Sequence, residues 1–234
     1  MIVLGIETAG PRGSVAVLHG DDRATEATFA ATRRLGAELA PAIQRLMKDE
    51  GLGPLNPPDL IAVDLGPGSY TGLRIGLATA KALSFAWGLP LIGVSTTDAL
   101  SAMAIRRGHT PVLCALDASR GQVYAALYAA GDGGILRQRA GGLVDPTAFG
   151  TTLTGPTHIV GDAAETFADA TRGLTADPEL TWPSAIEIAR AGRALHLEGT
   201  RVDPLQLAPN YYRPNEAETL RRKRAIKKKK TSKR

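Results

Sequence analysis

Apolar residues follow two alternating patterns along the chain, short strand-like runs and longer stretches of helical period. The first three runs are expected strands, at residues 2–8, 14–19 and 24–30. An amphipathic helix is expected over residues 34–50. Its apolar side chains recur at helical spacing, at Leu39, Ile43 and Leu46. The opening of the chain therefore predicts a three-stranded meander followed by a helix.

The same order of elements recurs further along. Strands are expected at 60–65 and 89–94, and helices after a glycine-rich loop and at 96–106. A second series has strands at 111–116, 122–129, 135–144 and 158–160, with helices at 163–171 and 184–195. The pattern βββαβαβα thus appears once in full and once in a shortened copy. It predicts an α/β protein of two related halves, residues 1–107 and 108–215.

A constrained loop joins the fourth strand to the central helix. It consists of Gly66, Pro67, Gly68, Ser69, Tyr70 and Thr71. The proline fixes φ, the glycines permit positive φ or close backbone approach, and Ser69 is a suitable helix N-cap. A P-loop requires an ending of Gly-Lys-Ser/Thr to reach phosphates and metal, whereas this loop continues Tyr-Thr-Gly-Leu-Arg. An autonomous phosphate site is therefore disfavoured here.

The helix after this loop carries a stripe of small residues. Gly72, Gly76, Ala80 and Ser84 are spaced four residues apart and share one face. Each glycine within a helix costs about 1 kcal/mol relative to alanine, which calls for a packing reason. Either the stripe packs on the chain's own sheet, or it admits the helix of a partner at close range.

Charge is concentrated at the C-terminal end. The net charge of the 234 residues is +5, yet residues 216–234 contain ten Lys or Arg and two Asp or Glu. The tail is expected to be disordered when free, because it cannot form a core. Its candidate RNA contacts are Arg221, Arg222, Lys223, Arg224, Lys227, Lys228, Lys229 and Lys230. Without an aromatic among them, the expected alternatives are a merely solvated tail or sequence-independent attraction to RNA.

Catalytic groups are hard to find in the sequence. The four histidines are isolated from one another, and Cys114 is the single cysteine, so neither a metal site nor a disulfide is expected. Asp64, Asp117 and Asp162 end or follow strands, where actin-like ATPases place acids, but no phosphate-gripping Lys accompanies them. Ser69 does not stand in a Gly-x-Ser-x-Gly context. We expect no catalytic residue, no metal and no cofactor.

Composition indicates a soluble protein. Hydrophobic residues make up 44% of the chain, and no apolar run approaches the roughly 18 residues of a membrane span. The start MIVLGIET lacks the features of a signal peptide. A cytoplasmic location and no membrane association are expected.

Four motifs in order are similar to those of one family. GIETAGPRGSVAV, DLGPGSYTGLRIGLATAKAL with LPLIGVSTTDAL, LDASRGQVYAALY and the closing PNYYR resemble the TsaB (YeaZ) family, which takes part in tRNA threonylcarbamoyladenosine (t6A) synthesis. The resemblance covers residues 1–213. It implies a duplicated RNase H-like fold of the actin and sugar-kinase superfamily, with two mixed-sheet subdomains and helices. Glu7 departs from the family, since an Asp is usual there.

The resemblance also implies a function. It points to a catalytically silent subunit that pairs with TsaD for threonylcarbamoylation of adenosine 37 in tRNA, with the TsaE ATPase and tRNA reached through the complex. The expected partner interface is Leu39, Ile43, Leu46, Gly72, Leu73, Gly76 and Ala80. The same helices are compatible with a homodimer. The alternative is an independent actin-like phosphotransferase or nucleotide hydrolase, and ATP turnover by the isolated protein separates the two hypotheses.

Overall fold

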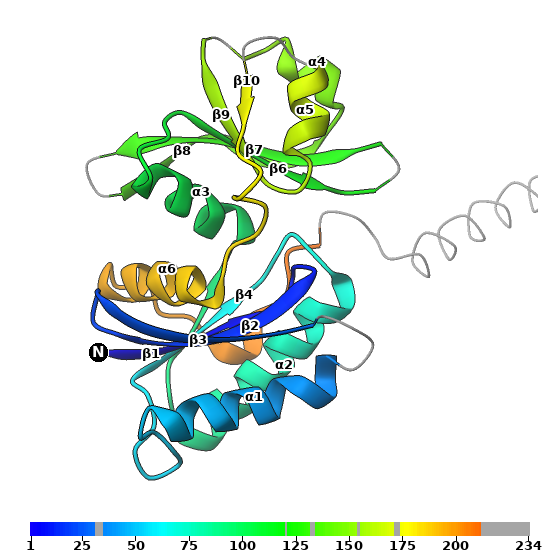
Figure 1. The fold of residues 1–234 in the computed structure, drawn as a ribbon. Coiled ribbons are helices and arrows are strands. Elements are labelled where there is room, and N and C mark those ends of the chain that lie inside the picture. Colours follow the sequence, from blue (N-terminus) through cyan, green and yellow to red (C-terminus); the bar gives the residue numbers. More distant parts are fainter. Residues whose placement is uncertain (31–34, 120, 132–133, 154, 171–173, 212–234) are drawn as a thin grey trace, which may run out of the picture.

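A computed structural model describes residues 1–30, 35–119, 121–131, 134–153, 155–170 and 174–211. Two five-stranded sheets form two stacked subdomains, the first below the second in Figure 1. None of the described helices is long and apolar enough to cross a membrane. The basic tail, with its candidate RNA contacts, lies outside the described residues.

The first sheet is built from β1 (Ile2–Glu7), β2 (Arg12–His19), β3 (Arg23–Ala30), β4 (Leu60–Asp64) and β5 (Leu91–Val94). Its order is β3-β2-β1-β4-β5, and β1 pairs antiparallel with β2 and parallel with β4. Both faces of β1 and β4 are buried, which explains their continuous apolar sequences. This mixed sheet confirms the strands expected from the first half of the chain.

The second sheet repeats this topology. Its strands are β6 (Val112–Asp117), β7 (Val123–Gly131), β8 (Gly134–Val144), β9 (Thr157–Val160) and β10 (Leu174–Ala176). In the order β8-β7-β6-β9-β10, β6 pairs antiparallel with β7 and parallel with β9, as β1 does with β2 and β4. The protein therefore has the duplicated RNase H-like fold. The short strand β10 was not predicted from the sequence.

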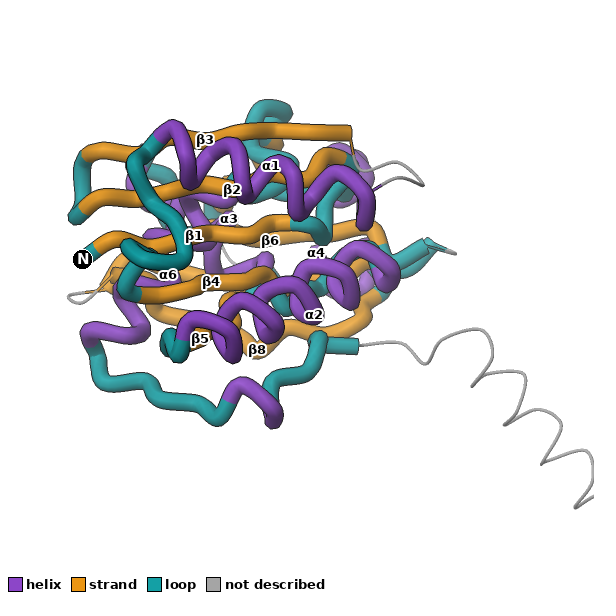
Figure 2. The backbone as a smooth tube through the Cα atoms, turned by 90° about the horizontal axis from the view of Figure 1, so that it is seen from below, coloured by secondary structure: helices purple, strands orange, loops and turns teal. Residues whose placement is uncertain are grey.

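Helices α1 (Leu35–Asp49) and α2 (Tyr70–Trp87) cover the outer face of the first sheet. Seen from below, they lie side by side on the sheet and run roughly along the direction of its strands (Figure 2). On the second sheet the corresponding positions belong to the short helices α4 (Pro146–Gly150) and α5 (Ala164–Ala170). The sequence did not predict α4, because five residues are too few to show a helical period.

Two further helices among the described residues are exchanged between the subdomains. The helix α3 (Thr96–Arg106) follows the first sheet in sequence but packs on the second. Conversely, α6 (Ala185–Leu197) follows the second sheet and packs on the first, where Ile188 and Ala189 join the core of β1 and β4. The prediction that residues 184–195 complete the C-terminal copy is thus corrected. Both helices lie between the two sheets in Figure 1.

Small residues allow α6 to approach the first sheet closely. A Cβ placed on Gly5 of β1 would overlap the carbonyl oxygen of Ala185, and one on Gly192 would overlap the Cβ of Ala62. The first backbone N–H of α6, at Ala185, donates to Ser14 Oγ (2.9 Å) and to Glu26 Oε1 (2.8 Å). Side chains of β2 and β3 therefore cap a helix that is more than 150 residues away in sequence.

A C-terminal segment crosses back to the first subdomain. The 3₁₀ helix η1 (Pro204–Gln206) lies against α2, and Lys81 Nζ donates to the Leu205 carbonyl (3.2 Å). Asn210 N donates to the Leu65 carbonyl (2.7 Å), and the Tyr211 ring stacks on Tyr70 at 4.9 Å. The last described residues thus lie beside the glycine-rich loop.

Candidate functional site

Two carboxylates are buried at the carboxyl ends of β1 and β4. Glu7 ends β1 and Asp64 ends β4, and the two strands are parallel neighbours. Open α/β sheets place their ligands at this edge, so these acids define the first candidate site. Exposure is 2% for Glu7 and 0% for Asp64, so neither carboxylate reaches solvent.

Glu7 holds the first hairpin turn. Its Oε1 accepts hydrogen bonds from the backbone N–H groups of Ala9 (2.6 Å) and Gly10 (2.9 Å). Burial raises the pKa of Glu7 well above its ordinary value, and the charge of the nearby Asp64 raises it further. Glu7 therefore closes the end of β1 and fixes the turn that follows it.

Asp64 holds the glycine-rich loop. It accepts from Gly66 N (2.7 Å) and lies 2.8 Å from the hydroxyl of Thr96, which is also 2.8 Å from the Pro67 carbonyl. Burial raises the pKa of Asp64 to about 7 from an ordinary 3.8. A hydroxyl has one proton, so both bonds of Thr96 form together when Asp64 is protonated and donates to it. The carboxyl group of Asp64 is therefore mostly neutral below pH 7, where it links Thr96 to the glycine-rich loop.

The hairpin turn and the glycine-rich loop pack on each other. Ser69 N donates to the Ala9 carbonyl (2.8 Å), and a Cβ on Gly68 would lie 2.6 Å from the Cβ of Ala9. Ser69 Oγ accepts from Gly72 N (3.2 Å), which confirms the predicted N-cap of α2. These bonds fix the position of the glycine-rich loop relative to the first hairpin turn.

The second subdomain has acids at the matching edge. Asp162 follows β9, and its Oδ1 accepts from the backbone N–H of Asp117, at the end of β6 (2.8 Å). Desolvation raises the pKa of Asp162.

Between the two edges, the Trp182 ring lies against the first hairpin turn, 3.1 Å from where a Cβ on Gly10 would be. Within the described residues, no three His, Cys, Asp or Glu side chains are grouped to hold a metal ion.

The small-residue stripe of α2 faces the chain's own sheet. Side-chain atoms on Gly72 or Gly76 would overlap the Thr8 carbonyl or hydroxyl oxygen, and Thr8 Oγ1 donates to the Gly72 carbonyl (2.9 Å). Leu73 is 1% and Ala80 0% exposed. The prediction that this stripe contacts a partner is corrected, and the alternative of packing on the sheet is confirmed.

The predicted contact residues of α1 are buried as well. Leu39, Ile43 and Leu46 are at most 4% exposed and join α2 and the first sheet in one hydrophobic core. An amphipathic pattern identifies the apolar face of a helix, and that face usually packs into the core of the same chain. The residues that the sequence analysis named as a partner interface are therefore core residues of the chain itself.

The outward faces of α1 and α2 form the second candidate site. They expose small residues, namely Gly36, Ala37 and Ala40 on α1 and Ala78, Ala82 and Ala86 on α2. Phe85 stands among them with 91% of its surface exposed. A groove of about 390 Å³ runs between the helices, with Gln44, Leu83 and Trp87 among its lining residues. The signal in the sequence was the spacing Ala78, Ala82, Ala86.

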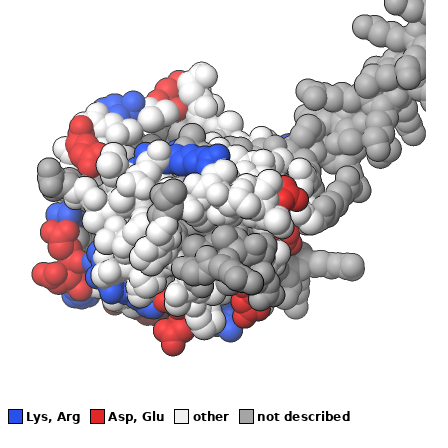
Figure 3. Space-filling view, turned by 90° about the horizontal axis from the view of Figure 1, so that it is seen from above, with Lys and Arg blue, Asp and Glu red and all other residues white. Residues whose placement is uncertain are grey.

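The surface of the second subdomain differs from the face of α1 and α2 in the side chains that it exposes. Seen from above, its described acidic and basic side chains are scattered around a broad uncharged area, with both signs present (Figure 3). The helix-covered face of the first subdomain carries the exposed Phe85 beside an apolar groove, which makes it the candidate surface for contact with another protein.

Together these features define a class. The chain is a duplicated RNase H-like α/β protein whose strand-end acids bind its own turns and whose first subdomain exposes a pair of small-residue helices. TsaB of Escherichia coli is 31% identical to it over 226 residues, covering 93% of the chain and 96% of that protein. The chain belongs to the TsaB (YeaZ) family.

Other comparisons agree with this assignment. Residues 29–175 match the family model described as TsaD, tRNA N6-adenosine threonylcarbamoyltransferase. TsaB of Bacillus subtilis is 33% identical over 128 residues, 55% of each chain. The structure of YeaZ from Pseudomonas aeruginosa superposes with a TM-score of 0.79 at 24% identity, covering 90% of this chain and 99% of that one. This structural likeness supports the fold.

Proposed function

We propose that the protein is a non-catalytic subunit that pairs with a TsaD homologue in the cytoplasm for threonylcarbamoylation of adenosine 37 in tRNA. Support for the pathway comes from the relatives, which are named tRNA threonylcarbamoyladenosine biosynthesis proteins. Support for a partner role comes from the exposed face of α1 and α2. The observation that carries it is Phe85, a large apolar side chain exposed amid small residues.

The chemistry of this face suits a helix pair as partner. Ala78, Ala82 and Ala86 repeat every four residues along α2, so a facing helix can approach with little steric hindrance. The groove beside them is lined by Leu83 and Trp87, which offer apolar area to an inserted side chain. A TsaD homologue, or a second copy of this chain in its absence, fits such a surface.

Absence of catalysis remains part of the proposal. Glu7 and Asp64 are engaged with the backbone of their own loops, which supports a structural role for both. Binding of TsaE and tRNA through the complex is proposed on the same grounds as TsaD pairing. Negligible ATP turnover by the isolated protein is expected, and turnover well above a blank would favour the phosphotransferase alternative.

The decisive experiment removes Phe85. Phe85→Ala loses almost no packing within the chain, so its melting temperature should stay within about 2 °C, while affinity for the TsaD homologue of the same genome falls at least about tenfold. Leu197→Ala is the matched control, because Leu197 is 63% exposed and belongs to α6. Affinity is measured by titration calorimetry and activity by a threonylcarbamoylation assay. Equal affinities for the two variants would reject this face as the interface.

The tail has a separate test. Deleting residues 219–234 should leave TsaD affinity unchanged, because Phe85 and its helix remain. It should weaken tRNA binding by the complex and flatten its dependence on salt, since ten basic residues are concentrated in 216–234. An unchanged salt dependence of tRNA binding would contradict the proposed contact between the tail and RNA.

A further inference from the structure

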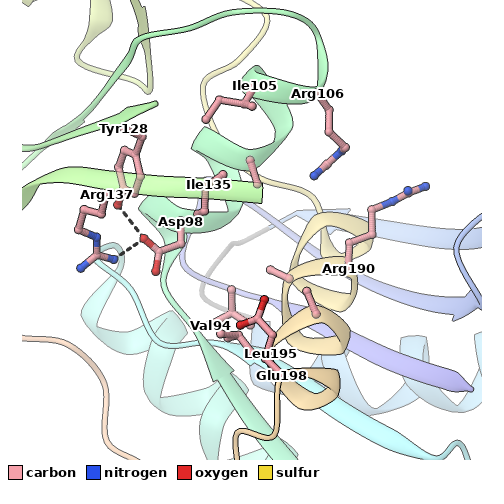
Figure 4. Close-up of a pocket in the computed structure, with 13 residues that line it drawn as sticks. Val94, Asp98, Ile105, Arg106, Tyr128, Ile135, Arg137, Arg190, Leu195 and Glu198 are labelled. Atoms are coloured by element: carbon pink, nitrogen blue, oxygen red, sulfur yellow. Dashed lines mark hydrogen bonds and ion pairs between the residues drawn. The ribbon is translucent and has the colours of Figure 1, made fainter. Parts of the chain in front are cut away.

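A cavity of about 590 Å³ lies between the exchanged helices α3 and α6 (Figure 4). Its apolar wall is formed by Val94, Ala102, Ile105, Ile135, Ala191 and Leu195. The volume falls in the range of small-molecule pockets, and the boundary between two subdomains is a common place for them. The face of α1 and α2 lies on the other side of the first sheet, so partner pairing does not account for this cavity.

One end of the cavity carries two arginines. Arg106 is the last residue of α3 and pairs with Glu187, which lies in the first turn of α6. Arg190, one turn further along α6, has its Nε 3.9 Å from Glu187 Oε1. This buried Nε has no hydrogen-bond partner among the described residues. Two guanidinium groups therefore share a single carboxylate.

The electrostatics of this end favour an additional anion. Burial lowers the pKa of Arg106, and the positive charge of Arg190 lowers it further. Glu187 compensates one of the two positive charges, so a bound anion between the guanidinium groups compensates the second and gives the Arg190 Nε–H a hydrogen-bond acceptor. In Figure 4 both arginines lie on the same side of the cavity, and Glu198 lies at a distance from them.

The acid at the other end is already satisfied. Asp98 accepts a hydrogen bond from the hydroxyl of the buried Tyr128 (2.7 Å) and pairs with Arg137. Its charge is therefore compensated within the chain, and it does not repel an anion bound near Arg106. The cavity thus combines an apolar body with one cationic end.

We propose that this cavity binds a small organic anion with an apolar body, whose carboxylate or phosphate group lies between Arg106 and Arg190. The apolar part lies along Ala102, Ile105 and Leu195. Guanidinium groups match the planar carboxylate and the phosphate equally, so the two head groups are distinguished by experiment.

The test uses the full chain and defined probes. Binding of anilinonaphthalene sulfonate is followed by fluorescence, and decanoate, decyl phosphate and decanol are added as competitors. We expect 1:1 binding, displacement by both anions, and at least tenfold weaker displacement by the uncharged decanol. The anion that displaces the probe at the lower concentration identifies the preferred head group.

Variants locate the site. Arg190→Met should weaken decanoate binding at least fivefold, while Arg193→Met, on the same helix but paired with Asp21, leaves it unchanged. Ala102→Phe fills the cavity and should abolish binding. Ala194→Phe, at an exposed position of the lining, gives a second test if Ala102→Phe disturbs folding. Melting curves verify the fold of each variant.

Three results would overturn the proposal. The first is absence of displacement by either anion at millimolar concentration. The second is equal weakening by Arg190→Met and Arg193→Met, which indicates a nonspecific charge effect. The third is full binding by both folded phenylalanine variants, which places the probe elsewhere.

Discussion

The two subdomains repeat one order of elements with outer helices of very different length. On the first sheet α1 has 15 residues and α2 has 18, whereas on the second α4 has 5 and α5 has 7. The short helices still bury a core, in which Phe149 and Phe167 meet edge to face at 5.9 Å. Short helices are therefore sufficient to cover one face of a sheet. The additional length of α1 and α2 in the first subdomain is available to form an outward surface.

The two subdomains also differ in how their outer helices contact the sheet. In the first subdomain, glycines bring α2 into backbone contact with the end of β1. The sequence of α5, AETFADA, contains no glycine, and Phe167 fills the space against its sheet instead. The first subdomain thus depends on close backbone approach and the second on a large side chain. Three predictions follow this contrast, in decreasing order of effect.

The largest effect is expected from Gly72→Leu. The new side chain would overlap the Thr8 carbonyl, and backbone cannot move aside easily, so we expect a loss of about 3 kcal/mol in unfolding free energy. Ala82→Leu is the matched control on the exposed face of α2 and should be nearly neutral. Chemical denaturation measures both. Equal stability of the two variants would mean that the stripe does not face β1.

The helix exchange predicts a smaller, localised effect. Gly192→Leu in α6 meets Ala62 of β4 and should cost about 2 kcal/mol. Although residue 192 lies in the C-terminal half of the sequence, hydrogen-exchange protection should fall in β1 and β4 and remain in β6 and β9. Selective loss in the second sheet would contradict the packing of α6 described above.

The smallest effect concerns the strand-end acids. Because burial raises the pKa of Asp64 to about 7 in the fold, its contribution to stability is complete below about pH 4 and is lost as the pH rises through 7. Asp64→Asn keeps a neutral side chain that donates to Thr96. Its unfolding free energy should therefore fall less between pH 6 and 7 than that of the natural protein, by about 1 kcal/mol.

Asp162→Asn provides the comparison from the second subdomain. Asp162 is more accessible to solvent than Asp64, so desolvation affects it less and its replacement should change the pH profile less. Denaturation at a series of pH values measures all three proteins. Parallel profiles for the natural protein and Asp64→Asn would show that Asp64 is charged in the fold at neutral pH.

Local sequence signals predicted much of the architecture. Strand runs, the helix over 34–50 and the N-cap at Ser69 all appear in the structure, because hydrophobic period and turn chemistry act within a few residues. The short elements α4 and β10 were missed, since they hold five and three residues. In the candidate site, the glycine-rich loop was recognised, but its bonds to the first hairpin turn join residues about 60 positions apart.

The amino-acid sequence by itself determined the order of elements, the duplication, the family and the small-residue stripe of α2. Tertiary structure alone decided which neighbour each face meets. Gly72 has the same helical spacing whether it faces a partner or Thr8, and the residues of α6 have the same period on either sheet. Periodicity specifies that a face must be buried, but the surface that buries it is chosen by contacts between segments distant in the chain. Those contacts turned the predicted interface inward and left Phe85 outside.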